Sequence, residues 1–203
     1  MKRRINPDID SVRGTHRIIN FSDAVFAVAI TLLVVQIPIP LKVSSQELGD
    51  DLIDGIPMLS SFAISFGVIA LLWLKHLHFN NHVKRYSVGL IWVNFLFLLV
   101  IAFLPYPTGV YGTHPSDEVA QIFYAVSVAL AGYLAAFMWV IVMRQPALFH
   151  DDVDMKEAAH STWVSFVMPT GFAISIIFSY IHPPIVPYIW IGFAIVSPLL
   201  RKI

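Results

Sequence analysis

Six apolar segments, each close to the length of a bilayer-spanning helix, follow one another along this 203-residue chain. A helix needs about 17–25 mostly apolar residues to cross the hydrocarbon core of a membrane. The six segments are Ile18–Ile39, Ile53–Leu74, Val88–Pro105, Ala120–Met143, Ser161–Tyr180 and Ile185–Leu200. Only 13% of the residues are charged, whereas soluble domains have about 25%. The sequence therefore predicts an all-α integral membrane protein with six transmembrane helices.

The connections between these segments are short, so we expect one six-helix domain over residues 1–203, in which residues 1–15 form a short N-terminal segment. Pro169 and Gly171 lie inside the fifth segment, and membrane proteins tolerate a kink at such positions. The tryptophans stand mostly toward segment ends, where indole rings commonly anchor helices at the membrane interface. We therefore expect a kinked fifth helix and mainly interfacial tryptophans.

Lysine and arginine are distributed unevenly between the two sides of the predicted bundle. The N-terminal segment, the second-to-third and fourth-to-fifth connections and the C-terminal end carry 12 of the 13 basic residues. Lys42 falls on the other side, which also carries the acidic residues Asp50, Asp51, Asp54, Asp117 and Glu118. Short loops rich in Lys and Arg stay in the cytosol. The sequence therefore predicts a multi-pass protein of the cell membrane with both termini in the cytosol.

Several chemistries have no signature in this chain. The formal net charge is zero and no basic patch is interleaved with aromatic residues, so no nucleic-acid partner is expected. The absence of cysteine excludes disulfides, thiolate catalysis and sulfur-ligated metals. No Gly-x-Ser-x-Gly or His-Glu-x-x-His motif and no phosphate-binding glycine loop is present. We expect neither an enzyme nor a cofactor.

Two ionisable residues, Arg17 and Asp23, stand at the entrance of the first apolar segment. An Asp at the centre of a membrane helix costs roughly 2.5–3.5 kcal/mol, and less near a helix end. The two residues are six positions apart and therefore lie on different faces of a helix, which prevents close pairing within it. Each side chain needs a partner elsewhere in the fold.

Trp73 and His76 should reach the same depth as Asp23, because the second segment ends on the side where the first begins. An indole N–H and an imidazole are suitable hydrogen-bond donors to a carboxylate. Asn94 on the third segment lies somewhat deeper. We hypothesise a network that clamps the first helix to the second or to a neighbouring subunit, and its members are Arg17, Ser22, Asp23, Trp73 and His76. The alternative is that Asp23 is a proton or cation site within a pathway.

One face of the first segment carries small and medium apolar side chains with a single hydroxyl. At about 100° per residue this face contains Ala24, Val28, Thr31, Leu32 and Val35. Such a stripe suits either close helix packing or a narrow apolar constriction of the kind that gates channels. From periodicity alone, helix packing is the preferred interpretation.

Two blocks of sequence resemble the transmembrane protein 175 family, the endolysosomal potassium channels and their bacterial relatives. The first is Arg17-x-x-x-Phe21-Ser22-Asp23 followed by Ala-Val-Phe-Ala-Val-Ala-Ile-Thr-Leu-Leu. The second comprises Trp73-Leu-Lys-His76, Asn94-Phe-Leu-Phe-Leu and Phe-Leu-Pro-Tyr-Pro-Thr108. The resemblance covers roughly residues 13–110, and the remaining helices match only in number and length.

The resemblance implies a potassium-selective cation channel in which four identical subunits surround a pore lined by the first helix of each. The usual filter sequence Thr-Val-Gly-Tyr-Gly is missing, as in that family. The narrowest ring falls on Val28, where the family usually has isoleucine, and the next pore-lining positions fall on Leu32 and Val35. The threonine layer linked to potassium preference falls on Thr31.

The resemblance also makes the arginine and the Phe-Ser-Asp residues structural, since they hold the pore helix rather than face the ion. The expected partners are a homotetramer of this chain, the lipid bilayer and permeant K⁺. A rival interpretation is a proton-coupled secondary transporter, with Asp23 as coupling site and the kinked fifth helix as moving element. A third is an accessory subunit without transport of its own.

Histidines gather at the end of the second segment. His78 and His82 are one helical turn apart, a spacing that can hold a divalent metal. No carboxylate nearby in the sequence completes a ligand set, and the neighbouring basic residues Lys75, Lys84 and Arg85 repel cations. Interfacial hydrogen bonding is therefore the preferred interpretation, with pH sensing as a lesser alternative, and no metal site is expected.

A second histidine lies among acidic residues in the fourth-to-fifth connection. His150 precedes Asp151, Asp152 and Asp154. Metal binding is one interpretation of this cluster. The preferred one is a solvated loop that caps the helix that follows, because Asp is a favourable residue at a helix N-cap.

Overall fold

The computed structural model of the chain describes residues 12–40 and 44–199, and helices dominate this part. The helices are α1 (Val12–Val35), α2 (Ser45–Asp54), α3 (Ile56–His82), α4 (Val88–Phe103), α5 (Pro105–Thr113), α6 (Glu118–Met143), α7 (Met155–Ser165), α8 (Val167–Ile181) and α9 (Val186–Leu199). Short 3₁₀ turns, η1 (Pro146–Leu148) and η2 (Pro183–Ile185), precede α7 and α9.

Five helical segments are long and apolar enough to cross a membrane. They are Gly14–Val35, Ile56–His82, Val88–Thr113, Glu118–Met143 and Met155–Ile181. The segment that contains α9, Pro183–Ser197, is apolar but shorter. The prediction of an all-α protein with several membrane-spanning helices is confirmed.

Several helix boundaries differ from those predicted, among them the ends of α1 and α3. α1 ends at Val35 instead of Ile39, because Pro38 and Pro40 lack the N–H that a helix requires. α3 continues from the predicted end at Leu74 to His82. Polar residues in this extension find hydrogen-bond partners inside the bundle, so polarity does not end the helix.

The short helix α2 was not predicted. Ser44 caps it, since its side chain accepts a hydrogen bond from the backbone N–H of Glu47 and the Glu47 side chain accepts one from the backbone N–H of Ser44. This reciprocal pair is a capping box. The hydrophobic pattern could not reveal α2, because six of its ten residues are polar or charged.

Two of the membrane-spanning segments are interrupted near a proline. α4 gives way to α5 at Leu104, three residues before Pro107, and α7 gives way to α8 at Phe166, three residues before Pro169. A proline ring clashes with the carbonyl four residues earlier, which here belongs to Phe103 or Ser165. The kink predicted in the fifth segment is confirmed.

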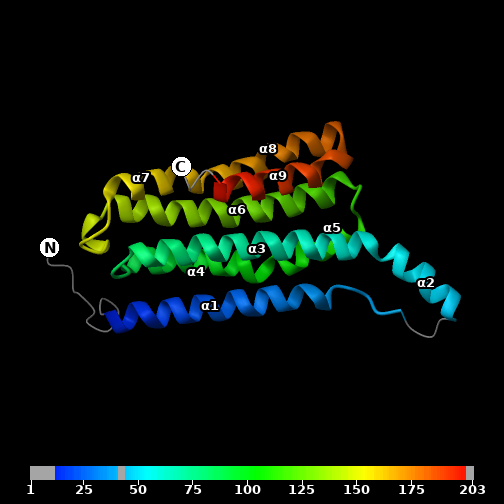
Figure 1. The fold of residues 1–203 in the computed structure, drawn as a ribbon, viewed down its shortest axis with the longest axis horizontal. Helices are drawn as coiled ribbons and strands as arrows, with labels where there is room; N and C mark the ends of the chain where they lie inside the picture. Colours follow the sequence, from blue (N-terminus) through cyan, green and yellow to red (C-terminus); the bar gives the residue numbers. More distant parts are fainter. Residues whose placement is uncertain (1–11, 41–43, 200–203) are drawn as a thin grey trace.

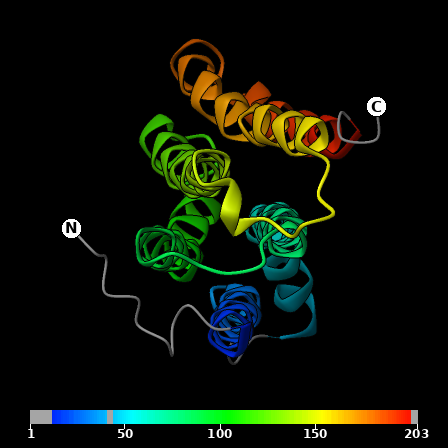
Figure 2. The same ribbon diagram turned by 90° about the vertical axis from the view of Figure 1, so that its left-hand side faces the viewer.

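The long helices lie side by side along one direction, with α1 on one edge of the bundle (Figure 1). Viewed end-on, α3 and α4 form the next layer, α6 lies between them and the last three helices, and α7, α8 and α9 form the opposite edge (Figure 2). The ends of α3 and α6 and the starts of α4 and α7 share one end of the bundle (Figure 1). We call this end the basic end, because most of the described Lys and Arg residues lie there.

Basic side chains gather at one end of the bundle. Among the described residues, the basic side chains near or in the connections of the basic end are Arg17, Lys75, Lys84, Arg85, Arg144 and Lys156. The opposite end carries acidic residues in α2 and at the start of α6, namely Glu47, Asp50, Asp51, Asp54, Asp117 and Glu118. Lys2, Arg3, Arg4, Lys42, Arg201 and Lys202 lie outside the described residues, as does most of the predicted N-terminal segment 1–15.

Aromatic side chains from four helices form the core on the α8 side. Trp190 is fully buried; its ring stacks on Phe172, with centroids 5.7 Å apart, and packs against Tyr124 at 4.8 Å and Tyr111 at 5.1 Å. Its indole N–H donates to Ser175 Oγ at 2.7 Å. The expectation of an interfacial anchor is wrong for Trp190 and for the buried Trp139, because both rings find apolar neighbours in the core.

Glycines allow close contact between the helices on this side. A Cβ at Gly132 of α6 would lie 2.8 Å from Pro169 Cβ, and one at Gly171 of α8 would overlap the ring of Phe193 in α9. Small residues at such contacts let membrane helices approach, and the gain comes from van der Waals packing.

We predict that Gly171→Ala destabilises the protein by about 1–3 kcal/mol, because the added methyl group forces the Phe193 ring aside in a filled contact. Gly192→Ala on α9 is the control, since a Cβ there meets nothing within 4 Å. Thermal unfolding in detergent, followed by fluorescence-detected size exclusion, measures both. Equal melting temperatures for the two variants would contradict this account of the contact.

Candidate functional site

Helix α1 is the least covered of the five candidate membrane-spanning segments. Within its most apolar window 22% of the residues are buried, against 33–50% for the other four. It packs against α3, α4 and α5, and it lies at the edge of the bundle (Figure 2). Its side toward these helices is apolar and tightly packed, with Phe26, Ala29 and Leu33 buried.

The stripe identified in the sequence lies on the side of α1 that points away from the rest of the chain. Val28 is 56% exposed, Leu32 43% and Val35 72%. Ala24 and Thr31 are exposed as well. The stripe is therefore largely left uncovered by its own chain and is available to another copy, to lipid or to a conduit.

The single hydroxyl of this stripe has a local hydrogen-bond partner. Thr31 Oγ1 donates to the carbonyl of Val28 at 2.9 Å. This bond uses the hydroxyl proton and leaves the lone pairs of the oxygen on the exposed face. Thr31 therefore presents an acceptor oxygen between the apolar side chains of Val28 and Leu32.

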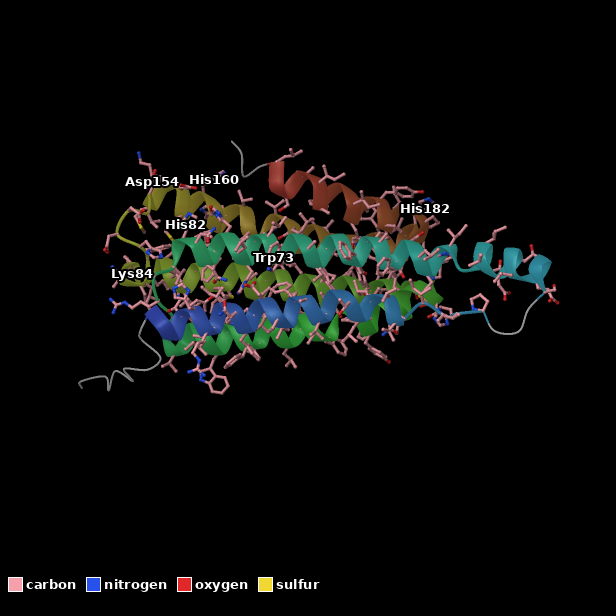
Figure 3. All side chains as sticks on the ribbon, turned by 60° about the horizontal axis from the view of Figure 1, so that its bottom comes forward. Trp73, His82, Lys84, Asp154, His160 and His182 are labelled. Atoms are coloured by element: carbon pink, nitrogen blue, oxygen red, sulfur yellow. The ribbon has the colours of Figure 1, made fainter. Side chains whose placement is uncertain are left out.

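Asp23 is held from the neighbouring helix. Trp73 Nε1 of α3 donates to Asp23 Oδ1 at 3.0 Å, and the carboxylate is only partly exposed. Trp73 lies midway along the bundle in Figure 3. The indole thus offsets part of the cost of keeping a carboxylate in an apolar helix.

The second link between α1 and its neighbours is a buried chain of hydrogen bonds. Asn94 Nδ2 of α4 donates to Ser22 Oγ at 3.1 Å, and Ser22 Oγ donates to the carbonyl of Ile18 at 2.9 Å. His76 Nε2 of α3 lies 2.9 Å from Asn94 Oδ1. Ser22, His76 and Asn94 are all buried, so three helices meet at polar groups hidden from the exterior.

This chain continues beyond the residues that the sequence pointed to. Asn80 Nδ2 lies 3.2 Å from His76 Nδ1, and Tyr86 OH donates to Asn80 Oδ1 at 2.6 Å. An amide nitrogen can only donate, so Nδ1 of His76 accepts and Nε2 carries the proton given to Asn94. Every donor then points the same way, from Tyr86 to Ser22. We call the set Ser22, His76, Asn80, Tyr86 and Asn94 the α1 anchor.

Aromatic rings surround the anchor. The ring of His76 stacks on Phe97 with centroids 5.5 Å apart, and Phe26 of α1 packs against both at 5.7 Å. Burial of this kind strengthens hydrogen bonds, and it also makes an unpaired polar group expensive. The anchor is therefore a rigid connection rather than a solvated cavity.

The structure does not bring all of the predicted network together. Arg17 is exposed on the single chain and takes no part in the contact between Trp73 and Asp23. Phe21 is also exposed and packs edge-on against Phe95 of α4, with centroids 6.0 Å apart. The predicted network did not include Asn80, which the sequence placed only among the histidines at the end of the second segment, or Tyr86; the signal was a polar Asn one helical turn after His76.

Comparison with known proteins assigns the chain to a family. Residues 17–105 match the family described as endosomal/lysosomal potassium channel TMEM175. A protein named potassium channel from Streptomyces collinus is 30% identical over 175 residues, which cover 83% of this chain and 84% of that protein. Another potassium channel, from Chamaesiphon minutus, is 36% identical over 116 residues, covering 55% of this chain and 57% of that protein.

The fold agrees with a solved structure. The crystal structure of a lysosomal potassium-selective channel TMEM175 homolog from Chamaesiphon minutus superposes with a TM-score of 0.82 at 26% sequence identity. The match covers 93% of this chain and 98% of that one.

We predict that Asn94→Ala lowers the unfolding free energy by about 1–3 kcal/mol, because it leaves the His76 N–H without its acceptor and Ser22 without its donor in a buried site. Asn81→Ala on α3 is the control, since that side chain is exposed. Thermal unfolding in detergent gives the melting temperatures of the two variants. A melting temperature of Asn94→Ala equal to that of Asn81→Ala would show that the anchor adds no stability.

Proposed function

We propose that the chain, which belongs to the TMEM175 family, is a potassium channel whose pore is built from the α1 helices of four copies. In this arrangement Val28 forms the narrowest ring, Leu32 and Val35 line the pore beyond it, and Thr31 supplies a layer of hydroxyl oxygens. No bound cofactor is required; the permeant ion is K⁺.

The observation that carries the proposal is the exposed stripe of α1. Its own chain leaves the stripe uncovered, while the opposite side of the same helix is fixed by packing and by the α1 anchor. One helix face cannot enclose a conduit, but copies arranged around a cyclic axis can. Small side chains such as Ala24 let the helices approach that axis closely.

An apolar ring selects ions by the cost of removing their water. No carbonyl or carboxylate ligands are present on the stripe to replace a hydration shell, so a narrow ring gates by dewetting. K⁺ holds its water less strongly than Na⁺ and passes at lower cost. This mechanism supports weak to moderate selectivity, to which the acceptor oxygen of Thr31 adds a polar contact.

The proposed pore leaves Asp23 and the α1 anchor as scaffold. Trp73 occupies one oxygen of the Asp23 carboxylate, and the members of the anchor use their polar atoms on one another. Phe21, Ser22 and Asp23 therefore hold the pore helix from behind, and Arg17, which is exposed on the single chain, would do so through a neighbouring copy. A proton-coupled transporter would instead need Asp23 to exchange its ion with both sides of the membrane.

We place the basic end of the bundle in the cytosol, with both termini on that side of the cell membrane. The support is the concentration of described Lys and Arg residues at this end.

We predict that Val28→Ala and Val28→Asn increase single-channel conductance, since both relieve an apolar constriction. The permeability ratio of K⁺ over Na⁺ should fall by about threefold to tenfold, equivalent to about 0.7–1.4 kcal/mol of discrimination. Currents from purified protein in planar bilayers measure both quantities. Val126→Ala, the same change at an exposed position of α6, is the matched control.

Wild-type conductance and selectivity in both Val28 variants would mean that Val28 faces lipid or protein. The same bilayer experiment separates the classes of function. A channel gives unitary currents, a transporter gives saturable proton-coupled exchange without them, and an accessory subunit gives neither.

A further inference from the structure

A histidine-carboxylate cluster lies at the basic end, outside the α1 stripe and the α1 anchor. Its members are His78 and His82 of α3 and Glu157 of α7, and one ligand atom from each lies within 4.8 Å of the other two. His82, the α7 N-cap residue Asp154 and His160 of α7 gather at this end in Figure 3. The carboxylate that is missing from the sequence around the histidines thus comes from a helix about 75 positions further along.

A hydrogen bond of the His82 ring leaves one ring nitrogen with a lone pair that can bind a metal. His82 Nδ1 lies 2.8 Å from the carbonyl of His78, so Nδ1 is the protonated nitrogen and Nε2 carries the lone pair. A metal-ligating histidine commonly has its other nitrogen bonded in this way, which fixes the tautomer and the ring orientation. His78 is oriented by α7 as well, since its Nε2 lies 3.2 Å from Ser161 Oγ.

The distances are close to those of a coordinated ion. His82 Nε2 lies 3.9 Å from Glu157 Oε1, and two ligand atoms of a tetrahedral Zn²⁺ ion at about 2.0–2.1 Å are about 3.3 Å apart. The Glu157 side chain is 61% exposed, whereas that of His82 is 13% exposed. The mobile carboxylate can therefore close the remaining distance while the imidazoles stay in place.

The surrounding backbone fixes α3 relative to the connection that leads into α7. His150 N donates to the carbonyl of His82 at 3.1 Å, and Lys84 N donates to the carbonyl of Leu148 at 2.8 Å. Asp154 then caps α7 by accepting from Lys156 N at 2.8 Å, as the sequence predicted for this loop. Both helix ends that carry the ligands are thus positioned before any ion binds.

One basic neighbour of the cluster, Lys84, is paired with a carboxylate. Lys84 Nζ lies 2.8 Å from Asp151 Oδ2, and this pairing lowers the pKa of the Asp151 carboxyl and offsets the lysine charge. The carbonyl end of α3, where His82 lies, carries the negative pole of the helix dipole. Trp139 packs against both imidazole rings, with centroids 5.7 and 5.4 Å away, and covers one side of the cluster.

We propose that His78, His82 and Glu157 bind a divalent transition-metal ion of the Zn²⁺ class, with water in the remaining position, and that the ion ties the end of α3 to the start of α7. Two imidazoles and one carboxylate are a ligand set that suits Zn²⁺. The site lies on the cytosol-facing side in the orientation proposed above. Its existence does not depend on the proposed pore.

The test is metal binding by tag-free, chelator-stripped protein in detergent, because a polyhistidine tag would itself bind the probe. Isothermal titration with ZnCl₂ gives stoichiometry and affinity, and thermal unfolding with and without ZnCl₂ gives the stabilisation. We expect one Zn²⁺ per chain and a higher melting temperature, as for any ligand that binds the folded state. Affinity should fall at least about tenfold in His82→Gln and in Glu157→Gln.

His150→Gln and Asp152→Asn are the matched controls, because they make the same chemical changes at exposed positions of the adjoining loop. Both should keep the wild-type affinity within about twofold. If His82→Gln fails to give monodisperse protein, Glu157→Gln still decides, since this exposed side chain has no packing role. Absence of saturable Zn²⁺ binding in the wild type overturns the proposal, and so does equal binding by ligand variants and controls.

Discussion

The arrangement of the bundle depends on hydrogen bonds that fix α1 to α3 and α4 on one side of the helix, while its other side is left exposed. In a bilayer, apolar side chains gain little by leaving lipid for protein, so the stripe and the core face of α1 do not by themselves decide how the helix is rotated. Hydrogen bonds to Ser22 and Asp23 determine the rotation of α1 about its axis, because polar groups in an apolar medium must find partners. Asn94 and Trp73 offer those partners from two different helices, which fixes both position and rotation.

Because Ser22 and Asp23 use their polar atoms toward α3 and α4, the exposed stripe of α1 is free to be mainly apolar. In the proposed pore a carboxylate on this stripe would bind cations strongly and slow their release, whereas Val28, Leu32 and Thr31 would bind them weakly. The separation of a polar, buried side from a mainly apolar, exposed side is therefore what the proposed pore helix requires. The same separation lets neighbouring copies approach without leaving buried charges unpaired.

The sequence was sufficient for the helical class and the kink near Pro169, because hydrophobic length and proline chemistry act locally. It also drew attention to Trp73 and Asp23, which contact each other. It did not reveal Asn80 and Tyr86 of the anchor, since their partners depend on how α3 and its following connection fold together. The carboxylate beside His82 was missed for the same reason: Glu157 is remote in sequence and near only in the folded bundle.

Helix α3 serves both polar clusters, on opposite faces. His76 and His78 are two positions apart, about 200° around the helix, so one points toward α4 and α1 and the other toward α7. Trp73 and the α1 anchor are therefore the contacts through which a displacement at the His82 end of α3 would reach α1. Helix α3 in this way joins the edge helix that carries the exposed stripe to the α7 side of the bundle.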